Sequence, residues 1–140
     1  MRAILTLVKV AVTVALVAWN APALATDWTP YREDSVVEII TLYPNGERRE
    51  TKVWIAVLDD AAYVRTNDSR WLANIRRLPD VLLRTRQQEE TFGAEVDDDE
   101  ALYDRVEGAF QEKYGLMQKI MSAMRVGRPT VIRLTPRSAD

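Results

Sequence analysis

Short runs of β-branched and apolar residues, separated by turn residues, predict a chain built mainly of strands. The run over residues 36–42 is followed by Tyr43-Pro-Asn-Gly46, a strong turn signal because Asn-Gly tolerates the positive φ angles of tight hairpins. Residues 53–58 are nearly all apolar, as expected for a strand that is covered on both faces. The predicted strands cover residues 36–42, 48–58, 61–65, 81–86, 90–96 and 129–135.

Two other segments have apolar residues at spacings of three and four, which is typical of amphipathic helices. They predict a short helix over about residues 69–77 and a longer one over residues 97–114. Polar residues 67–69 can cap the first helix, and Leu78-Pro79 ends it. Residues 116–124 are a candidate for a further short helix.

The order of these segments is hairpin, strand, helix, strand, strand, helix and strand. Parallel βαβ units need a more regular alternation of strand and helix. The order therefore predicts an α+β protein, mainly β, in which a small antiparallel barrel of about six strands carries two flanking helices. We expect residues 26–140 to form one domain, because the segment has the usual size of a single domain and contains no linker or repeat.

The first 25 residues have the features of a signal peptide. Arg2 and Lys9 give a basic start, an apolar run covers residues 10–19, and Ala23-Leu24-Ala25 has the small-x-small form of a cleavage site. The apolar run is shorter than the roughly 20 residues of a membrane-spanning helix, so we expect no stable membrane anchor after cleavage. The sequence thus predicts an exported protein, periplasmic or secreted. The alternative is a retained anchor, with the Lys9 side chain reaching the membrane interface.

Composition excludes several kinds of site and partner. The formal net charge is −2, and cleavage of the predicted leader would make it more acidic, so we expect no nucleic-acid partner. The chain has no cysteine, which excludes disulfides and thiolate chemistry. It also has no histidine, which removes Ser-His-Asp catalysis, ordinary zinc and copper sites and the usual axial ligand of heme. Any reaction would have to use other polar side chains or a bound cofactor.

An acidic run over residues 95–100 precedes the longer predicted helix. It lacks the alternating ligand positions and the central glycine of an EF-hand calcium loop. Acidic side chains at a helix start are expected in any case, because they complement the helix dipole. The sequence therefore predicts no metal site.

The segment from Ala62 to Arg84 reads as a strand, a polar turn, a short basic helix and a second strand. Its turn places four polar side chains at the helix start, where free N–H groups and a partial positive charge favour phosphate. Among them, Arg70 can form two parallel charge-assisted hydrogen bonds to a phosphate. The alternative is an ordinary capped helix with surface arginines. The four side chains are Thr66, Asn67, Ser69 and Arg70.

Three local patterns occur at the expected strand and turn positions. They are Thr51-Lys-Val-Trp-Ile55, Tyr63-Val-Arg-Thr-Asn-Asp-Ser-Arg-Trp71 with Asn74 and Pro79, and Val131-Ile-Arg-Leu-Thr-Pro136. In this order and spacing they resemble the split β-barrel superfamily of pyridoxamine-phosphate-oxidase-like and deazaflavin-dependent nitroreductase-like proteins, in particular its small exported members. The resemblance covers about residues 36–136.

The resemblance implies a cofactor site and a homodimer, because the cofactor in these barrels commonly lies between two subunits. It implies that Lys52, Val53 and Trp54 face the ring of FMN or of the deazaflavin F420. The polar turn would then face the cofactor phosphate, and Arg84 and Arg86 could add charge. Trp54 also has a plain alternative, that of a core residue.

The chain departs from the flavin-binding pattern in two places. Trp71 stands where flavin-binding members usually carry a lysine, and the turn before the helix is one residue shorter than theirs. Trp71 followed by Asn74 is closer to the deazaflavin type. These departures leave the choice between FMN and F420 open.

Two functions follow from the sequence. The first is an exported oxidoreductase that binds a phosphate-bearing flavin or deazaflavin. The second is a non-catalytic exported module that binds a small anionic ligand in a degenerate cofactor pocket. Heme binding ranks below both, because without histidine or cysteine it would need tyrosine or methionine ligands. No catalytic residue can be assigned.

Overall fold

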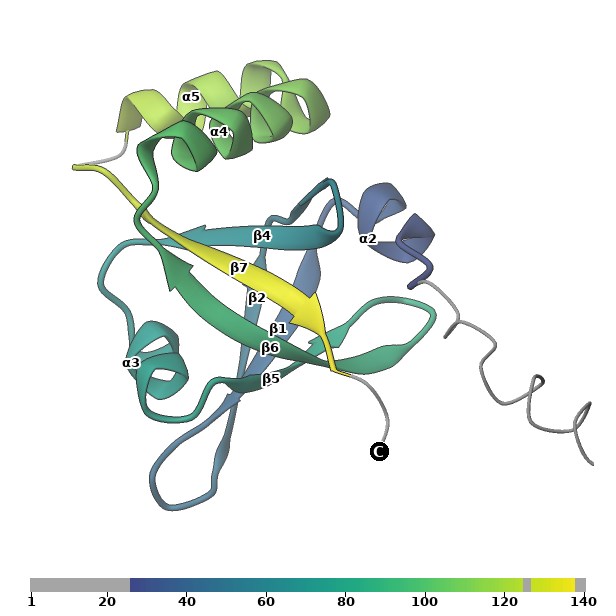
Figure 1. Ribbon diagram of the computed structural model, residues 1–140, viewed down its shortest axis with the longest axis vertical. Coiled ribbons are helices and arrows are strands. Elements are labelled where there is room, and N and C mark those ends of the chain that lie inside the picture. Colours follow the sequence, from purple (N-terminus) through teal and green to yellow (C-terminus); the bar gives the residue numbers. More distant parts are fainter. Residues whose placement is uncertain (1–25, 125–126, 138–140) are drawn as a thin grey trace, which may run out of the picture.

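The computed structural model describes residues 26–124 and 127–137 (Figure 1). The predicted signal peptide, residues 1–25, lies outside the described residues. Within the described ranges, no helix has the length and apolar character needed to cross a membrane. The elements are α2 (Thr29–Glu33), β1 (Val37–Leu42), β2 (Arg48–Val53), β3 (Ala56–Leu58), β4 (Ala61–Thr66), α3 (Arg70–Arg77), β5 (Asp80–Arg84), β6 (Glu89–Asp97), α4 (Glu100–Tyr114), α5 (Leu116–Met124) and β7 (Thr130–Pro136).

The strands form one curled sheet in the order β2-β1-β5-β6-β7-β4-β3. Every described strand pair is antiparallel, which confirms the predicted arrangement. The two ends of the sheet, β2 and β3, follow one another in the chain, so the sheet bends back on itself as a split barrel. The turn at Tyr43–Gly46 joins β1 to β2, and Gly46 has the expected positive φ of 87°.

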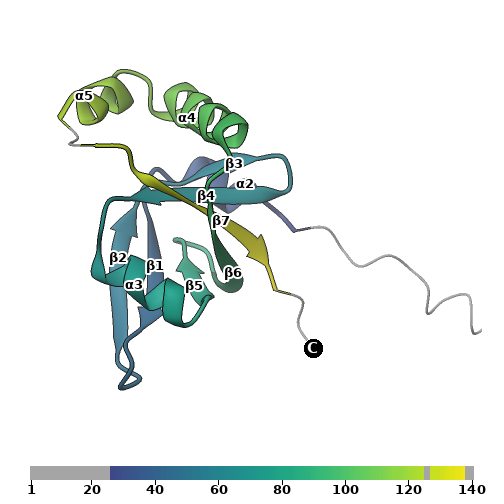
Figure 2. The same ribbon diagram turned by 60° about the vertical axis from the view of Figure 1, so that its left-hand side comes forward.

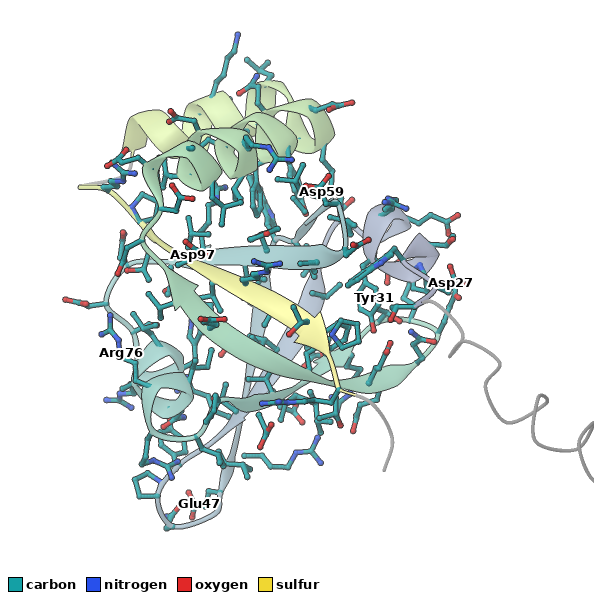
Figure 3. The ribbon with its side chains drawn as sticks, viewed as in Figure 1. Asp27, Tyr31, Glu47, Asp59, Arg76 and Asp97 are labelled. Carbon is teal, nitrogen blue, oxygen red and sulfur yellow. The ribbon has the colours of Figure 1, made fainter. Side chains whose placement is uncertain are left out.

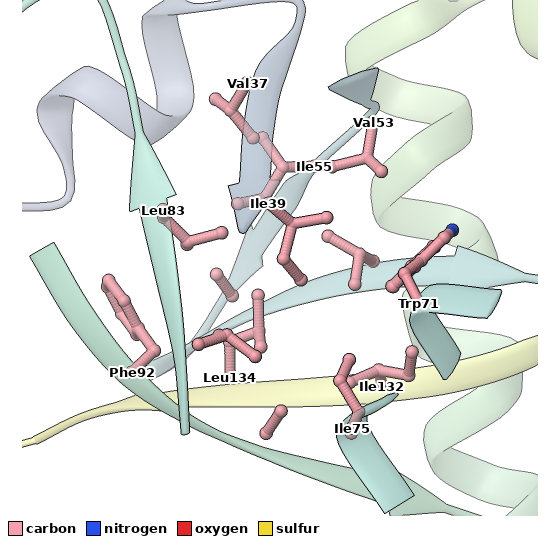
Figure 4. Packing of buried hydrophobic residues seen from close by; sticks show 14 of the residues in the cluster. Val37, Ile39, Val53, Ile55, Trp71, Ile75, Leu83, Phe92, Ile132 and Leu134 are labelled. Carbon is pink, nitrogen blue, oxygen red and sulfur yellow. The ribbon is translucent and has the colours of Figure 1, made fainter. Parts of the chain in front are cut away.

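The inside of the barrel holds the main core. Ile39, Leu83 and Phe92 from three strands are fully buried there, and α3 adds Trp71 and Ile75 from the open side (Figure 4). Ser69 is the N-cap of this helix, because its Oγ accepts a hydrogen bond from the Leu72 N–H. It is one of the three predicted cap residues, 67–69. The apolar stripe predicted for residues 69–77 therefore faces the barrel.

A second, smaller core lies on the outer face of the sheet under α4 (Figure 2). β4 and β7 separate the two cores, because successive side chains of a strand point to opposite faces. Ile132 enters the barrel, whereas Val131 packs against α4 with Val106 and Phe110, which confirms the prediction that residues 131 and 132 face opposite ways. Figure 1 shows α4 and α5 side by side above this face.

Two details of the predicted element order were wrong. Residues 48–58 form two strands, because the ladder is interrupted at residues 54 and 55, where the Ile55 backbone bonds to side chains of α4. The segment before β1, where the apolar pattern predicts neither a strand nor a helix, contains the short helix α2. Tertiary contact holds this helix, because the ring of Tyr31 is fully buried and meets Phe92 edge-to-face at 5.5 Å.

The end of α2 is held to the loop after β5 by a buried carboxylate. Asp34 is 4% exposed, and its Oδ1 accepts hydrogen bonds from Arg86 Nη2 at 2.8 Å and Nε at 3.0 Å. Its Oδ2 accepts the backbone N–H of Arg86 at 3.1 Å. These bonds lower the pKa of Asp34 below its usual value. The charged carboxylate therefore stabilises the folded protein.

We expect Asp34→Asn to lower the free energy of unfolding at pH 7 by about 1–2 kcal/mol, because charge-assisted bonds to Arg86 are lost. Because the pKa of Asp34 is lowered by folding, its carboxylate contributes to the free energy of unfolding of the wild type. This contribution is complete above the pKa of about 3.9 that the group has in the unfolded chain, and it is lost as the pH falls through the lower pKa of the folded protein. Urea unfolding between pH 7 and pH 3 should show the two proteins converging at low pH. Asp60→Asn, in an exposed turn, is the control, and a constant difference at all pH values would contradict the prediction.

Candidate functional site

A cleft of about 360 Å³ lies at the seam of the barrel. One wall is formed by β2 and Trp54, which follows it. The other wall is formed by the end of β4, the turn after it and the first turn of α3. α4 contributes Phe110 from above. The lining residues are Thr51, Lys52, Val53, Trp54, Arg65, Thr66, Asn67, Trp71, Phe110 and Pro129. We call this space the seam cleft.

Five of the nine candidate site residues that the sequence predicts line the seam cleft together. The chain separates them into two groups, residues 52–54 on β2 and its bulge and residues 66–67 after β4. The sequence assigned the first group to a cofactor ring and the second to its phosphate. The fold brings both groups to one space, as a single bound molecule would require.

Ser69 and Arg70 lie elsewhere. The Ser69 side chain is used within the protein, because it caps α3 and also accepts a hydrogen bond from the Thr66 hydroxyl at 3.0 Å. Arg70 is exposed and lines a different hollow, which it shares with residues 43–47 of the β1–β2 hairpin. The predicted grouping of Arg70 with the other turn residues in one pocket is therefore not observed.

Arg84 also lies apart from the residues that line the seam cleft. Its guanidinium makes ion pairs with Glu89 at 3.1 Å, Glu50 at 3.3 Å and Glu38 at 3.6 Å. These partners come from three neighbouring strands, so the side chain bridges β2, β1, β5 and β6 on one face of the sheet. Arg86 binds Asp34, as described above. The structure does not bring either arginine to the seam cleft.

Arg65 is a cleft residue that sequence reasoning missed. Its side chain is 6% exposed, and its Nη1 and Nη2 donate to Glu107 at 2.5 Å and to Gln118 at 2.8 Å. The guanidinium carbon lies 3.7 Å from the centre of the Phe110 ring. One signal in the sequence could have found it, because an arginine inside the apolar run 61–66 needs a specific partner when the strand is buried.

Trp54 is half-buried and belongs to a stack of aromatic rings. Its ring lies parallel to that of Tyr114, with centroids 4.3 Å apart and an interplanar angle of 5°. Tyr114 in turn lies 5.8 Å from Phe110, at an angle of 18°. The stack continues to Arg65, so α4 fixes both the aromatic wall and the cation of the seam cleft.

Tyr114 and Lys113, at the end of α4, satisfy the backbone where β2 breaks. The Tyr114 hydroxyl accepts the N–H of Ile55 at 3.0 Å and donates to the carbonyl of Ser35 at 2.7 Å. Burial raises the pKa of Tyr114, so the hydroxyl keeps its proton at neutral pH and can donate. The side chain thus replaces a strand partner for residue 55.

The Lys113 ammonium group completes this arrangement with three bonds at 2.8–2.9 Å. Burial lowers the pKa of Lys113 to about 8, so most molecules keep all three protons at neutral pH. Each proton is then available for one carbonyl oxygen. The acceptors are the backbone carbonyls of Tyr31, Asp34 and Ile55.

The β2 wall of the cleft carries polar groups that have no hydrogen-bond partner in the sheet. β2 pairs only with β1 within the described sheet, so half of its backbone N–H and C=O groups point away from the ladder. The side-chain oxygen of Thr51 is buried and has no hydrogen-bond partner among the described residues. Buried polar atoms are normally satisfied, so this hydroxyl is an exception that costs stability.

The seam cleft therefore fits a flat ligand that carries an anionic group. It offers the ring of Trp54, backbone groups along the open edge of β2 and the guanidinium of Arg65, which is ion-paired with Glu107, while the ring of Phe110 is fully buried behind them. Over residues 26–124 and 127–137, the side chains form no cluster of carboxylates able to hold a metal ion.

No family model matches the chain, and no curated protein does either. Solved structures do resemble it. HutZ of Vibrio cholerae, described as a heme storage protein, has a TM-score of 0.64 and 14% identity, covering 79% of this chain and 88% of its own. An FAD-binding protein of Mesorhizobium loti has a TM-score of 0.61 and 10% identity, covering 79% and 84%. The F420-H2-dependent reductase FDR-A has a TM-score of 0.57 and 12% identity, covering 81% and 99%.

Likenesses at such low identity concern the fold alone. All three matches span most of both chains, and a protein from Listeria innocua, described only as a candidate pyridoxamine 5′-phosphate oxidase, matches over a similar range. The resemblance expected from the three sequence patterns is confirmed at this level. The chain has the split β-barrel fold of the pyridoxamine-phosphate-oxidase-like proteins.

Proposed function

We propose that the protein binds a flavin or deazaflavin, FMN or F420, in the seam cleft and acts as an oxidoreductase with it. One observation carries the proposal: Lys52, Trp54 and Thr66, chosen from distant parts of the sequence, line one cleft with the buried cation Arg65. Its volume of about 360 Å³ lies within the range of roughly 300–1,000 Å³ usual for small-molecule sites. The folds of the FAD-binding and F420-dependent neighbours add support.

In this proposal the protein supplies position and electrostatics, while the cofactor carries the hydride chemistry. Trp54 offers one flat apolar face to the ring, and the free backbone groups of β2 meet its polar edge. Arg65 and Lys52 provide positive charge for the anionic part. The side-chain amide of Asn67 can donate to phosphate oxygens from the opposite wall, whereas the hydroxyl proton of Thr66 is already donated to Ser69.

A second candidate is a non-catalytic module for a small anion, and specific contacts favour it. Arg65 is already bound to Glu107 and Gln118, and Ser69 already serves the helix start. Both features leave less of the site free for a cofactor phosphate. Heme, which one neighbour is described as storing, is a weaker candidate because the chain has no histidine or cysteine.

We expect purified protein, added to FMN or F420, to quench the fluorescence of the cofactor, because the proposal places the cofactor ring next to Trp54. Trp54→Leu should weaken binding about tenfold, because loss of an aromatic face costs about 1–1.5 kcal/mol. Lys52→Gln should weaken it less and in a salt-dependent way, because the side chain is exposed.

Arg84→Gln is the control for Lys52→Gln, since it removes one cation from the same sheet outside the cleft. Equal effects of the two variants would contradict the assigned position of the ligand. If neither FMN nor F420 binds and inorganic phosphate still raises the melting temperature, the second candidate is favoured over the first.

We also propose that the protein is exported, as its N-terminal sequence predicts, and that it works as a homodimer. Support for the dimer comes from α5, where Leu116 is 72%, Met117 53% and Ile120 47% exposed. Three neighbouring exposed apolar side chains on one short helix suit a covered surface. A second copy placed against α5 would lie close to Gln118 and the Arg65 network.

Light scattering should give the mass of two chains for the protein without residues 1–25. Ile120→Glu should give the mass of one chain, because a carboxylate in an apolar interface costs several kcal/mol. Val36→Glu is the control, since Val36 is also an exposed apolar residue, at 46%, and belongs to the segment before β1 and not to α5. A wild-type mass of one chain would contradict the proposal.

A further inference from the structure

A groove of about 700 Å³ lies beside β3, between α2 and α4. All three residues of β3, Ala56–Leu58, line it, together with Arg32 of α2 and a face of α4 around Gly108. Both helices contact β3 (Figure 2). Figure 3 shows Asp59, in the turn after β3, close to α2. The groove shares no lining residue with the seam cleft, and we call it the β3 groove.

One residue of β3 turns both of its backbone hydrogen-bonding groups toward the free edge of the sheet. Among the described strands, β3 pairs only with β4. A two-residue turn joins the two strands, and Leu58 faces Ala61 across it. The pair that closes such a turn exchanges its hydrogen bonds, so the next pair, Val57 with Ala62, does not. The N–H and C=O of Val57 therefore point away from β4.

Two residues earlier, side chains of α4 complete the same edge. There the N–H of Ile55 donates to the Tyr114 hydroxyl, and the C=O of Ile55 accepts from the Lys113 ammonium group. In the part of the chain that the structure describes, no loop or side chain does the same for Val57. An open donor and acceptor on a strand edge are the groups with which an extended peptide pairs.

Gly108 leaves space in the wall of the groove that no described part of the protein fills. It lies within the 15-residue helix α4, where glycine costs about 1 kcal/mol relative to alanine. Apart from its own helix backbone and chain neighbours, a Cβ here would have no heavy atom within 4 Å. Of the other four glycines, Gly93 lies against Arg137 and three have positive φ. The missing side chain of Gly108 thus keeps room for a molecule that approaches α4 closely.

The lining of the β3 groove is basic, although the whole chain has a net charge of −2. Its charged residues are Arg32, Arg105, Lys113 and Glu112. Arg105 pairs with Asp59 at 2.6 Å, whereas Lys113 bonds to backbone carbonyls, which do not cancel its charge. Arg32 is exposed and makes no ion pair within residues 26–124 and 127–137. A net positive charge therefore remains for an acidic partner.

We infer that the β3 groove is a docking site for an extended peptide segment of another protein, and that this segment carries acidic side chains. The backbone of the segment pairs with the N–H and C=O of Val57 as an added strand of the sheet. One of its carboxylates pairs with Arg32, and its chain passes close to α4 at Gly108. The site is separate from the seam cleft, so the inference goes beyond the proposed function and does not depend on it.

The test titrates isotope-labelled protein with the peptide acetyl-Val-Glu-Val-Glu-Val-amide and follows the backbone amide resonances by NMR spectroscopy. We expect saturable shifts at Val57 and Gly108. The matched peptide acetyl-Val-Lys-Val-Lys-Val-amide should bind about tenfold more weakly, because it brings like charges to the basic lining. Arg32→Gln should weaken the acidic peptide about threefold, as expected for one exposed ion pair, and should not weaken the basic peptide.

Gly108→Leu tests the position of the peptide without loss of stability. The melting temperature should stay the same or rise, because leucine favours the helix and no neighbour opposes a Cβ here. The new side chain should fill the groove and weaken the acidic peptide about tenfold or more, since it removes the space for an added strand. Ala101→Leu is the matched control, because Ala101 is exposed on the same helix and does not line the groove.

Three results would overturn the inference. The first is the absence of shifts at Val57 and Gly108, or equal affinity for the acidic and the basic peptide. The second is unchanged affinity in a folded Gly108→Leu variant, which would place the peptide elsewhere. The third is a shift at Val57 when the protein alone is diluted, because a second copy of the chain would then fill the groove.

Discussion

The fold of the site depends on one contact: the last two residues of α4 form hydrogen bonds with the backbone N–H and C=O of Ile55. At this point the chain leaves β2, at one edge of the sheet, and enters β3, at the other edge. Buried backbone groups without partners would be costly; the Tyr114 hydroxyl accepts the N–H of Ile55, and Lys113 donates to its carbonyl, as a neighbouring strand would otherwise do. The break can therefore exist only where the end of α4 lies.

That contact also gives the seam cleft its shape. Tyr114 stacks on Trp54 while its hydroxyl holds Ile55, so one side chain sets both the backbone break and the aromatic wall. One turn before Tyr114, α4 places Phe110 under Arg65, and about one turn further back Glu107 pairs with the same guanidinium. The ring of Trp54 and the guanidinium of Arg65 are thus held by one helix-to-sheet contact, and the seam cleft is a product of the same packing that closes the outer core.

Much of the fold could be predicted because its signals are local. Alternating apolar residues marked most strands, Pro79 and Ser69 marked the ends of α3, and Gly115 ended α4 with a positive φ. The break at Ile55 could not be predicted, because it depends on side chains 59 residues away. The role of Arg65 depends in the same way on Glu107 and Gln118, which lie on elements that the local pattern does not connect with β4.

β2 leaves one side of its backbone unpaired, and open strand edges of this kind can join the edges of other molecules and begin aggregation. On this strand, Arg48, Glu50 and Lys52 are exposed at every second position and carry charges of alternating sign. Charged side chains along an edge discourage such joining, because a second strand would have to bring them out of water. A chain without disulfides can therefore keep one backbone edge of its sheet open and still be protected against edge-to-edge joining of strands.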